Sequence, residues 1–372
     1  MKAPFSVLLA IFLLLLFGCA QKEAAAPAAS HPAPNATTTA GTPAPGVKYS
    51  SYELPIGERS FYLGVVPTPK SIPAITQQGL VDAYAEAGKL GEVTMVWPSG
   101  GWHGACQRLQ SSRTVEAVRN MGLKPVINLN FYTIAEVPGK GLQVVPDAPA
   151  GVNASLRNAE FRRLFVEEVR DCSRMFKPEY LSLGNEVGAF YATNPDAFDD
   201  YVSLYGEAYD AVKQESPGTK VFAVFSLNQL ENANQWQLIG KFGQKLDLLG
   251  ITTYPWMNYS SPKDMPDSYY QRLGGYTSKP VAFTEIGWVS ASSAGSSENE
   301  QAEYLVRFLN LTKGMRVEMV NWLFLHEPAA IGGTAGAMSA AETKTIALKN
   351  SDGSEKEVYG VWKDLHNLPL RK

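Results

Sequence analysis

The chain has 372 residues, a formal net charge of −3, 45% hydrophobic residues and 19% charged residues, so it can bury a substantial core. This composition excludes disordered and fibrous proteins. The 33 basic and 36 acidic residues nearly balance and form no basic run, which excludes a nucleic-acid partner, because phosphate binding needs a concentrated positive surface. The four His are scattered and the three Cys form no close pair, so the sequence predicts no metal site.

Residues 1–19 have the pattern of an export signal. Lys2 gives a basic start, and the apolar run 5–17 is shorter than the roughly 20 residues that a membrane-spanning helix needs. Leu16-Phe17-Gly18-Cys19 follows and resembles the lipobox of bacterial lipoproteins, in which the Cys becomes the lipidated first residue. The resemblance implies that Cys19 anchors the chain to a membrane of the bacterial cell envelope, facing away from the cytoplasm. A plain secretory peptide cut near Cys19 is the alternative.

Residues 20–48 form a linker rich in Ala, Pro and Thr. Such a composition has almost nothing to bury and predicts a disordered, extended segment. One domain, residues 49–372, follows it. A linker of this kind holds a folded domain away from a membrane, which favours ligands outside the cytoplasm.

Short apolar runs recur along the domain, each followed by an amphipathic segment, and this alternation predicts parallel strands with helices outside them. The eight runs are Phe61–Val66, Glu92–Trp97, Lys124–Asn130, Tyr180–Leu183, Lys220–Phe225, Leu246–Thr252, Pro280–Thr284 and Met319–Leu325. Residues 158–175 and 196–214 are typical of the helices, because their apolar residues recur at spacings of three and four. Eight such units in one α/β domain predict a (β/α)8 TIM barrel.

An open doubly wound sheet is the alternative fold. Its nucleotide-binding members carry a Gly-rich loop after the first strand. Here that position reads Val65-Val66-Pro67-Thr68-Pro69, and proline has no backbone N–H to offer a phosphate. The barrel is therefore the favoured prediction.

Export would permit a disulfide between Cys106 and Cys172. In the predicted barrel, however, Cys106 falls just before one helix and Cys172 near the end of a later one, which places them at opposite ends. A disulfide needs Cα atoms about 4.4 to 6.8 Å apart. The sequence therefore predicts two free, buried thiols.

Two carboxylates directly follow predicted strands, at the end of the barrel where active sites gather. The fourth strand runs into Gly184-Asn185-Glu186, and the seventh runs into Glu285. An ionised Glu is disfavoured beside a buried strand unless a function needs it. Two carboxylates facing each other are what glycosidic bond cleavage requires. As alternatives, Glu186 could stabilise a helix N-terminus and Glu285 could pair with an Arg.

The motifs Gly184-Asn185-Glu186-Val187 and Glu285-Ile286-Gly287-Trp288 resemble those of clan A glycoside hydrolases, in particular the endo-β-1,3-glucanase and endo-β-1,4-galactanase families. Thr253-Tyr254-Pro255-Trp256 is more similar to the galactanases. The resemblance implies a retaining enzyme without a cofactor, in which Glu186 is the acid/base and Glu285 the nucleophile. The clan's Arg near the end of strand two is absent, since this stretch reads Met95-Val96-Trp97-Pro98-Ser99.

The resemblance also implies a set of substrate-binding residues. Asn185 would bind the 2-hydroxyl of the sugar in the cleavage subsite, Tyr254 would orient Glu285, and Trp322 would stack under the sugar. Core packing is the alternative for Trp322.

Further candidates for sugar binding stand near the predicted strand ends. Four are Trp residues, on which the apolar face of a sugar ring could stack, and core packing is the alternative for each of them. Two are His residues that could bind a sugar hydroxyl, and one is a further carboxylate. These candidates are Trp97, Trp102, Trp256, Trp288, His103, His326 and Glu327.

The sequence thus predicts a monomeric retaining glycoside hydrolase that acts on a β-linked oligo- or polysaccharide, with its two carboxyl groups about 5 to 5.5 Å apart. A surface lipoprotein that binds glycans without cutting them is one alternative, supported by the missing Arg of strand two. A transglycosylase that uses the same two Glu residues and an acceptor sugar is another.

Overall fold

The structure is a computed structural model that describes residues 47–70, 76–137, 139, 141–328 and 340–371. The predictions for the export signal, for Cys19 and for most of the linker fall outside the described residues. Within the described ranges, no helix has the length and apolar character needed to cross a membrane.

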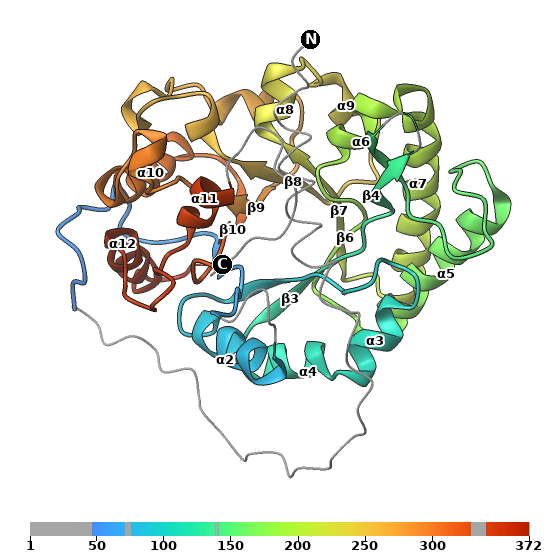
Figure 1. Cartoon of the computed structure of the whole chain (residues 1–372), viewed down its shortest axis with the longest axis horizontal. Coiled ribbons are helices and arrows are strands. Elements are labelled where there is room, and N and C mark those ends of the chain that lie inside the picture. The colour runs from blue at the N-terminus through green and yellow to red at the C-terminus, as the bar shows by residue number, and fades with distance from the viewer. Residues whose placement is uncertain (1–46, 71–75, 138, 140, 329–339, 372) are drawn as a thin grey trace.

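The described residues form a closed barrel of eight parallel strands with helices outside it (Figure 1), which confirms the predicted (β/α)8 fold. The strands follow one another around the barrel in chain order, and the last pairs with the first. Each one overlaps a predicted run. The strands are β1 (Tyr62–Val65), β2 (Val93–Val96), β3 (Lys124–Asn128), β6 (Tyr180–Ser182), β7 (Lys220–Ser226), β8 (Leu248–Thr253), β9 (Val281–Ile286) and β10 (Val317–Trp322).

The helices follow the barrel strands along the chain and surround the barrel. The α-helices are α2 (Gln77–Ala87), α3 (Ala105–Ser111), α4 (Thr114–Asn120), α5 (Ala159–Phe176), α6 (Val187–Thr193), α7 (Phe198–Glu215), α8 (Leu227–Asn232), α9 (Gln237–Gly240), α10 (Glu298–Leu311), α11 (Ala340–Thr343) and α12 (Glu357–His366). Short 3-10 helices are η1 (Pro195–Ala197), η2 (Pro255–Met257), η3 (Pro262–Asp264), η4 (Gln271–Gly275), η5 (Ser292–Ala294) and η6 (Lys344–Ile346).

Helix α5 shows how the sequence sets these elements. The Asn158 side chain accepts a 2.9 Å hydrogen bond from the N–H of Phe161 and caps the helix. Phe161, Phe165 and Val169 follow at spacings of four and are buried. Lys177, in the left-handed conformation, ends the helix. The helices predicted at 158–175 and 196–214 are confirmed as α5 and as η1 followed by α7.

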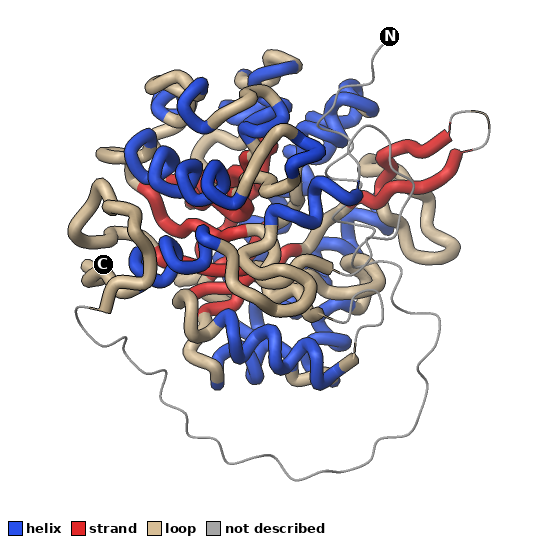
Figure 2. The backbone as a smooth tube through the Cα atoms, turned by 60° about the vertical axis from the view of Figure 1, so that its left-hand side comes forward, coloured by secondary structure: helices blue, strands red, loops and turns tan. Residues whose placement is uncertain are grey.

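An antiparallel hairpin in the crossover after β3 was not predicted. Its strands are β4 (Tyr132–Val137) and β5 (Gly141–Pro146), and Figure 2 shows them projecting from the body of the molecule. The sequence does carry a signal, since two alternating runs flank a short stretch that contains Gly139. The Asn194 side chain donates a 2.8 Å hydrogen bond to the Val144 carbonyl and fastens the hairpin beside α6.

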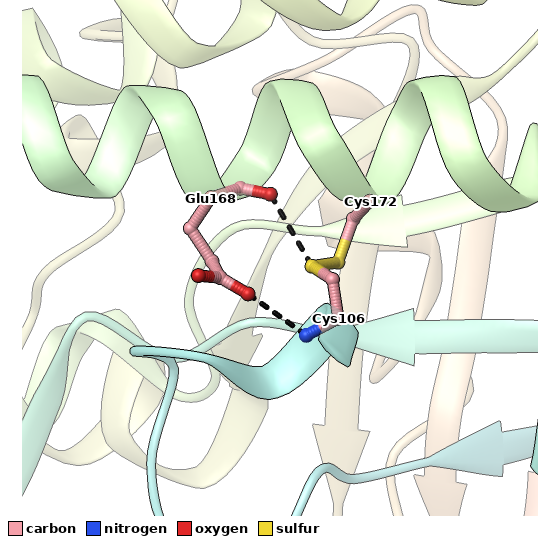
Figure 3. A group of neighbouring side chains, drawn as sticks. All are labelled: Cys106, Glu168 and Cys172. Atoms are coloured by element: carbon pink, nitrogen blue, oxygen red, sulfur yellow. Dashed lines mark hydrogen bonds between the residues drawn. A yellow bond between two sulfur atoms is a disulfide. The ribbon is translucent and has the colours of Figure 1, made fainter. Parts of the chain in front are cut away.

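The prediction of free thiols is wrong, because Cys106 and Cys172 form a disulfide with their Cα atoms 5.1 Å apart (Figure 3). After β2 the chain does not enter a helix at once. It runs along α5, where the Trp102 ring packs on Phe165, so that Cys106 is already beside the later half of α5 when α3 begins. The Glu168 carboxylate accepts hydrogen bonds from the N–H groups of Gly104 (2.9 Å) and Cys106 (2.8 Å) and fixes this approach.

The N-terminal end of the barrel holds a partly buried polar cluster. Glu318 accepts a 2.5 Å hydrogen bond from the Tyr180 hydroxyl and lies 2.7 Å from the Lys220 ammonium. Lys124 lies over the Tyr62 ring, 4.9 Å from its centroid. The carboxylate at this end therefore has both a hydroxyl and a cation as partners.

Candidate active site

Glu186 stands at the C-terminal end of the barrel, after β6. Gly184 makes the turn with φ of 144°, and a Cβ there would lie 2.6 Å from the Tyr201 hydroxyl oxygen, so only glycine fits. Glu186 itself has φ of 45°, in the left-handed region, and is fully buried. A non-glycine residue held in this conformation is uncommon and is often found at functional sites.

Side chains from the end of β3 and from β4 hold Asn185. The Asn130 side-chain oxygen accepts a 3.0 Å hydrogen bond from the Asn185 N–H. The Tyr132 hydroxyl donates a 2.5 Å bond to the Asn185 carbonyl, and the Asn128 amide donates a 3.4 Å bond to the Asn185 side-chain oxygen. Sequence reasoning missed these three residues, because their roles depend on which strands become neighbours.

Glu285 is the counterpart of Glu186 on β9, and Thr252 connects the two. Thr252 pairs in register with Glu285 across the strands β8 and β9. Its hydroxyl donates a 2.5 Å hydrogen bond to Oε1 of Glu186. The structure therefore brings the two predicted carboxylates to one place at the C-terminal end of the barrel. Thr252 is a further site residue that the sequence did not reveal.

Tyr254 binds Glu285. Its hydroxyl donates a 2.5 Å hydrogen bond to Oε2 of Glu285, the contact that the family resemblance implied. The Asn228 side chain fixes the Tyr254 backbone with two hydrogen bonds. Its amide nitrogen donates a 2.9 Å bond to the Tyr254 carbonyl, and its amide oxygen accepts a 2.9 Å bond from the Tyr254 N–H. Both Tyr254 and Asn228 are buried, so the orientation of the hydroxyl is set by the strand ends and not by solvent.

The two carboxyl groups are electrostatically coupled. Burial raises the pKa of Glu186 to about 7, although the Thr252 hydrogen bond opposes the shift. Burial, and then the charge of Glu186, raise the pKa of Glu285 well above its usual range, against the Tyr254 hydrogen bond. Two carboxyls that repel each other in a buried site retain a proton between them at neutral pH.

Each carboxyl uses one oxygen and leaves the other unpaired. Oε2 of Glu186 and Oε1 of Glu285 are buried without a hydrogen-bond partner among the described residues. Within the same part of the chain, no Lys, Arg or His nitrogen lies within 4 Å of either carboxylate. Met95, in the stretch where the clan carries its Arg, is buried on β2. Hydroxyl groups of Thr252 and Tyr254 donate the hydrogen bonds that these two carboxylates receive among the described residues.

Two predicted sugar-stacking residues pack among the outer helices. The Trp322 N–H donates a 2.8 Å hydrogen bond to the Ile346 carbonyl, and its ring lies 5.9 Å from that of Trp362 in α12. The Trp288 ring lies 5.4 Å from that of Tyr304 in α10. Both indoles are almost fully buried, so a role in sugar stacking rests on the sequence alone. Trp97 and Trp256 are half-buried and Trp102 is buried in the core.

His326, the first candidate after β10, lies beside a carboxylate of α2. His326 Nε2 lies 2.9 Å from Oε2 of Glu86 in α2, and Lys349 lies 2.7 Å from the other oxygen. Burial raises the pKa of Glu86, but its hydrogen bonds to His326 and Lys349 outweigh burial and lower it to about 2. A sugar contact by His326 therefore rests on the sequence alone, as it does for His103, whose side chain is exposed.

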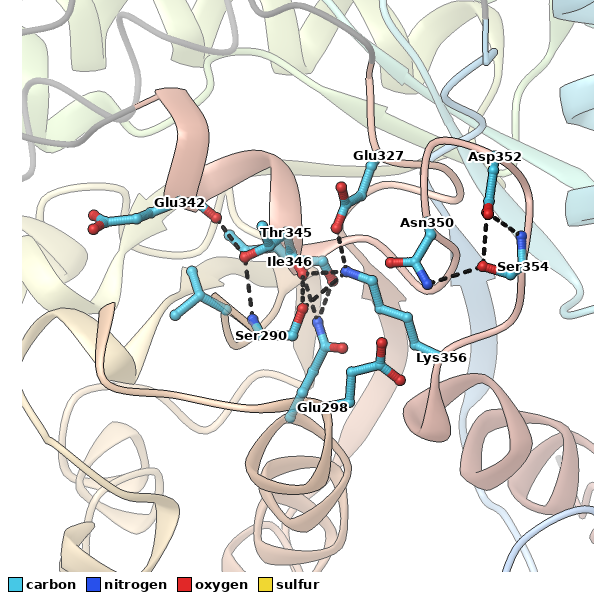
Figure 4. A network of polar contacts seen from close by, with 12 residues as sticks. Ser290, Glu298, Glu327, Glu342, Thr345, Ile346, Asn350, Asp352, Ser354 and Lys356 are labelled. Atoms are coloured by element: carbon cyan, nitrogen blue, oxygen red, sulfur yellow. Dashed lines mark hydrogen bonds and ion pairs between the residues drawn. The ribbon is translucent and has the colours of Figure 1, made fainter. Parts of the chain in front are cut away.

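Figure 4 shows the Lys356 ammonium between loops that follow β9 and β10. It lies 2.6 Å from Glu327, 2.7 Å from the Thr345 carbonyl and 3.0 Å from the Ser290 hydroxyl. Lys356 is 2% exposed. Glu327 therefore has a buried cation as its partner, unlike Glu186 and Glu285.

No family model and no curated protein sequence matches the chain. Solved structures do match. The exo-β-1,4-mannosidase from Opitutaceae bacterium strain TAV5 matches with a TM-score of 0.62 and 15% identity, over 85% of this chain and 60% of that one. GH5_18 from Streptomyces cattleya in complex with GlcNAc matches with a TM-score of 0.61 and 13% identity, over 83% and 80%. The GH53 catalytic domain from Ignisphaera aggregans matches with a TM-score of 0.52 and 16% identity, over 77% of this chain and 88% of that one.

What these proteins share with the chain is the fold. They are glycoside hydrolases by their descriptions, and at this level of identity they establish the barrel architecture. The chain spans 60% of the length of the mannosidase.

Proposed function

We propose that the chain is a retaining glycoside hydrolase that cleaves β-linked glycans with Glu186 and Glu285. The observation that carries the proposal is the coupled, buried pair of carboxyls at the C-terminal end of the barrel, each with one oxygen bound by a hydroxyl and one unpaired. Buried carboxyls without a neutralising cation destabilise a fold, so a function accounts for their presence better than packing does. The (β/α)8 glycoside hydrolases found among the solved structures support the proposal.

The proposed reaction has two steps. Glu285, ionised and held by the Tyr254 hydroxyl, attacks the anomeric carbon. The glycosidic bond breaks, and the leaving oxygen takes its electron pair and the proton of Glu186. Glu186 then removes a proton from water, whose oxygen attacks the same carbon and releases Glu285. The proton that the pair retains at neutral pH belongs on Glu186 for the first step.

Asn185 is proposed to bind the 2-hydroxyl of the sugar, a contact that strengthens in the transition state. Three neighbours hold its side chain and backbone, which gives the rigidity that such a contact needs. The proposal includes no cofactor, a monomeric chain, and anchorage through lipidated Cys19 in the bacterial cell envelope.

The experiment measures reducing-sugar release by the full chain from β-glucans, galactans and mannans, beside the Glu186→Gln, Glu285→Gln and Glu318→Gln variants. Glu318 is the matched control, because it is a buried carboxylate at the opposite end of the barrel, paired with the partly exposed Lys220. We expect hydrolysis by the wild type and by Glu318→Gln, and none by the other two. NMR of the anomeric proton checks retention, and product analysis separates a hydrolase from a transglycosylase.

One observation favours a second candidate, a glycan-binding protein without catalysis. The described residues place no cation near Glu285, and a nucleophile whose pKa is raised is less often ionised. If no glycan of the panel is cut while one of them binds, and Glu285→Gln binds it equally well, the chain is a binding protein and the retaining mechanism is wrong.

A further inference from the structure

A groove of about 770 Å³ opens at the N-terminal end of the barrel. Its walls come from the start of β7, from the segments before β8 and β9, and from the residue before β10. The carboxylate pair lies at the C-terminal ends of β6 and β9. The groove is therefore on the opposite end of the barrel from the candidate active site, and its size lies in the range of ligand sites.

The charged residues of the groove are mostly cations. Lys213, Lys220, Lys279 and Arg316 line it, and Asp247 is the acidic residue among the described residues of its lining. Lys213 is paired with Asp247 at 2.6 Å, and Lys220 with Glu318 at 2.7 Å. Among the described residues, no carboxylate lies within ion-pair distance of Lys279 or Arg316. In a chain with a net charge of −3, this local excess of positive charge favours an anionic ligand.

An aromatic ring is held in place at the groove. Tyr276 lines the groove, is 44% exposed and stacks on Trp236, with ring centroids 4.8 Å apart and planes at 15°. Arg272 lies 4.9 Å from the Trp236 centroid and is itself bound by Glu231. One face of Tyr276 is therefore covered and its orientation fixed, which leaves the exposed part of the ring as a platform for stacking.

We propose that this groove binds an acidic polysaccharide, one whose sugars carry carboxylate groups, away from the catalytic pair. Such a sugar presents an apolar ring face and a carboxylate on the same unit, which match Tyr276 and the two cations Lys279 and Arg316. The site goes beyond the proposed function, because it neither uses nor requires Glu186 and Glu285. Its effect on catalysis, which rests on the proposed function, is to retain a polymer on the protein while another stretch of it reaches the active site.

The test is calorimetric titration of the full chain with polygalacturonate oligomers, with neutral β-1,4-galactan oligomers as the comparison. Tyr276→Ala and Lys279→Glu are each expected to weaken polygalacturonate binding about tenfold. Raising the salt from 50 to 500 mM is expected to weaken it further. Lys89→Glu is the matched control, since Lys89 is exposed just before β2 and does not line the groove. Binding of the neutral oligomers stays unchanged in all three variants.

The proposal is overturned if the wild type does not bind polygalacturonate, if Lys89→Glu weakens binding as much as Lys279→Glu, or if single-stranded DNA binds the groove more tightly than polygalacturonate. The Glu285→Gln variant keeps this test independent of catalysis. If this variant cuts no glycan but binds polygalacturonate like the wild type, binding in the groove is supported independently of the hydrolase proposal.

Discussion

Buried carboxylates at the two ends of the barrel have opposite surroundings. At the N-terminal end, Glu318 has the Tyr180 hydroxyl and the Lys220 ammonium as partners. At the C-terminal end, Glu186 and Glu285 each have one hydroxyl and then each other. The Lys220 cation neutralises Glu318, which gives this carboxylate a structural role. Glu186 and Glu285 have no such cation among the described residues and repel each other, which is the arrangement that acid–base and nucleophilic chemistry uses.

The largest effect is expected for Glu285→Gln at the C-terminal end. The rate of glycan hydrolysis should fall by more than about 10³-fold, because the amide cannot form the glycosyl-enzyme. The free energy of unfolding, measured in urea, should stay the same or rise, because one of two repelling groups becomes neutral. A variant that loses stability but keeps its activity would make Glu285 a structural residue like Glu318.

The same chemical change at the other end, Glu318→Gln, should have the reverse outcome. It leaves the Lys220 ammonium without its counter-charge, and the free energy of unfolding should fall by about 2 kcal/mol. The loss stays moderate because the Lys220 side chain is 44% exposed and regains hydration. Hydrolysis rates at 25 °C should remain within about twofold of the wild type. A large fall in rate would show that the two ends are not independent.

Stability should depend on pH through the two carboxyls, because folding raises the pKa of Glu186 from 4.5 to about 7 and raises the pKa of Glu285 well above its usual range. Above pH 4.5 the folded chain therefore keeps protons that the unfolded chain releases. The free energy of unfolding should fall as pH rises from 5 to 7, by about 3 kcal/mol or more. Urea unfolding at pH 5, 6, 7 and 8 measures the slope.

The Glu186→Gln variant is the reference for this slope and should show a flatter profile over the same window. Glu86 and Glu92 do not affect the slope between pH 5 and 8. Their pKa values are lowered to about 2, so their contributions to the free energy of unfolding are lost only as pH falls below about 4.5. An unchanged slope in Glu186→Gln would place the raised pKa on another group.

The smallest effect is expected from the hydroxyl that supports Glu186. Thr252→Val removes a hydrogen bond that lowers the pKa of Glu186, so the alkaline limb of the kcat profile should move to higher pH and kcat should fall about tenfold. Thr253→Val is the matched control, because its hydroxyl faces Tyr270 at 3.4 Å. If both variants leave the pH profile unchanged, Thr252 serves packing alone.

The barrel and the positions of its two Glu residues could be predicted because their signals are local. Each strand is an apolar run, and each Glu stands near the C-terminal end of one, Glu285 within β9 and Glu186 shortly after β6. Tyr132 and Thr252 could not be predicted, because their hydrogen bonds depend on strand neighbours and register. The disulfide was missed because periodicity does not reveal the course of the chain between β2 and α3. Trp322 stands at a strand end as expected, but its ring packs toward Trp362.

The bond between Cys106 and Cys172 closes a covalent ring, with a sequence separation of 66 residues. The ring contains β3 and the β4–β5 hairpin, and so Asn128, Asn130 and Tyr132, which hold Asn185. Both Cys residues precede Glu186 and Glu285 in the chain. Formation of this ring needs an oxidising compartment. Protein made in a reducing cytoplasm should assemble its barrel without this cross-link, and production through an export route is the way to obtain it.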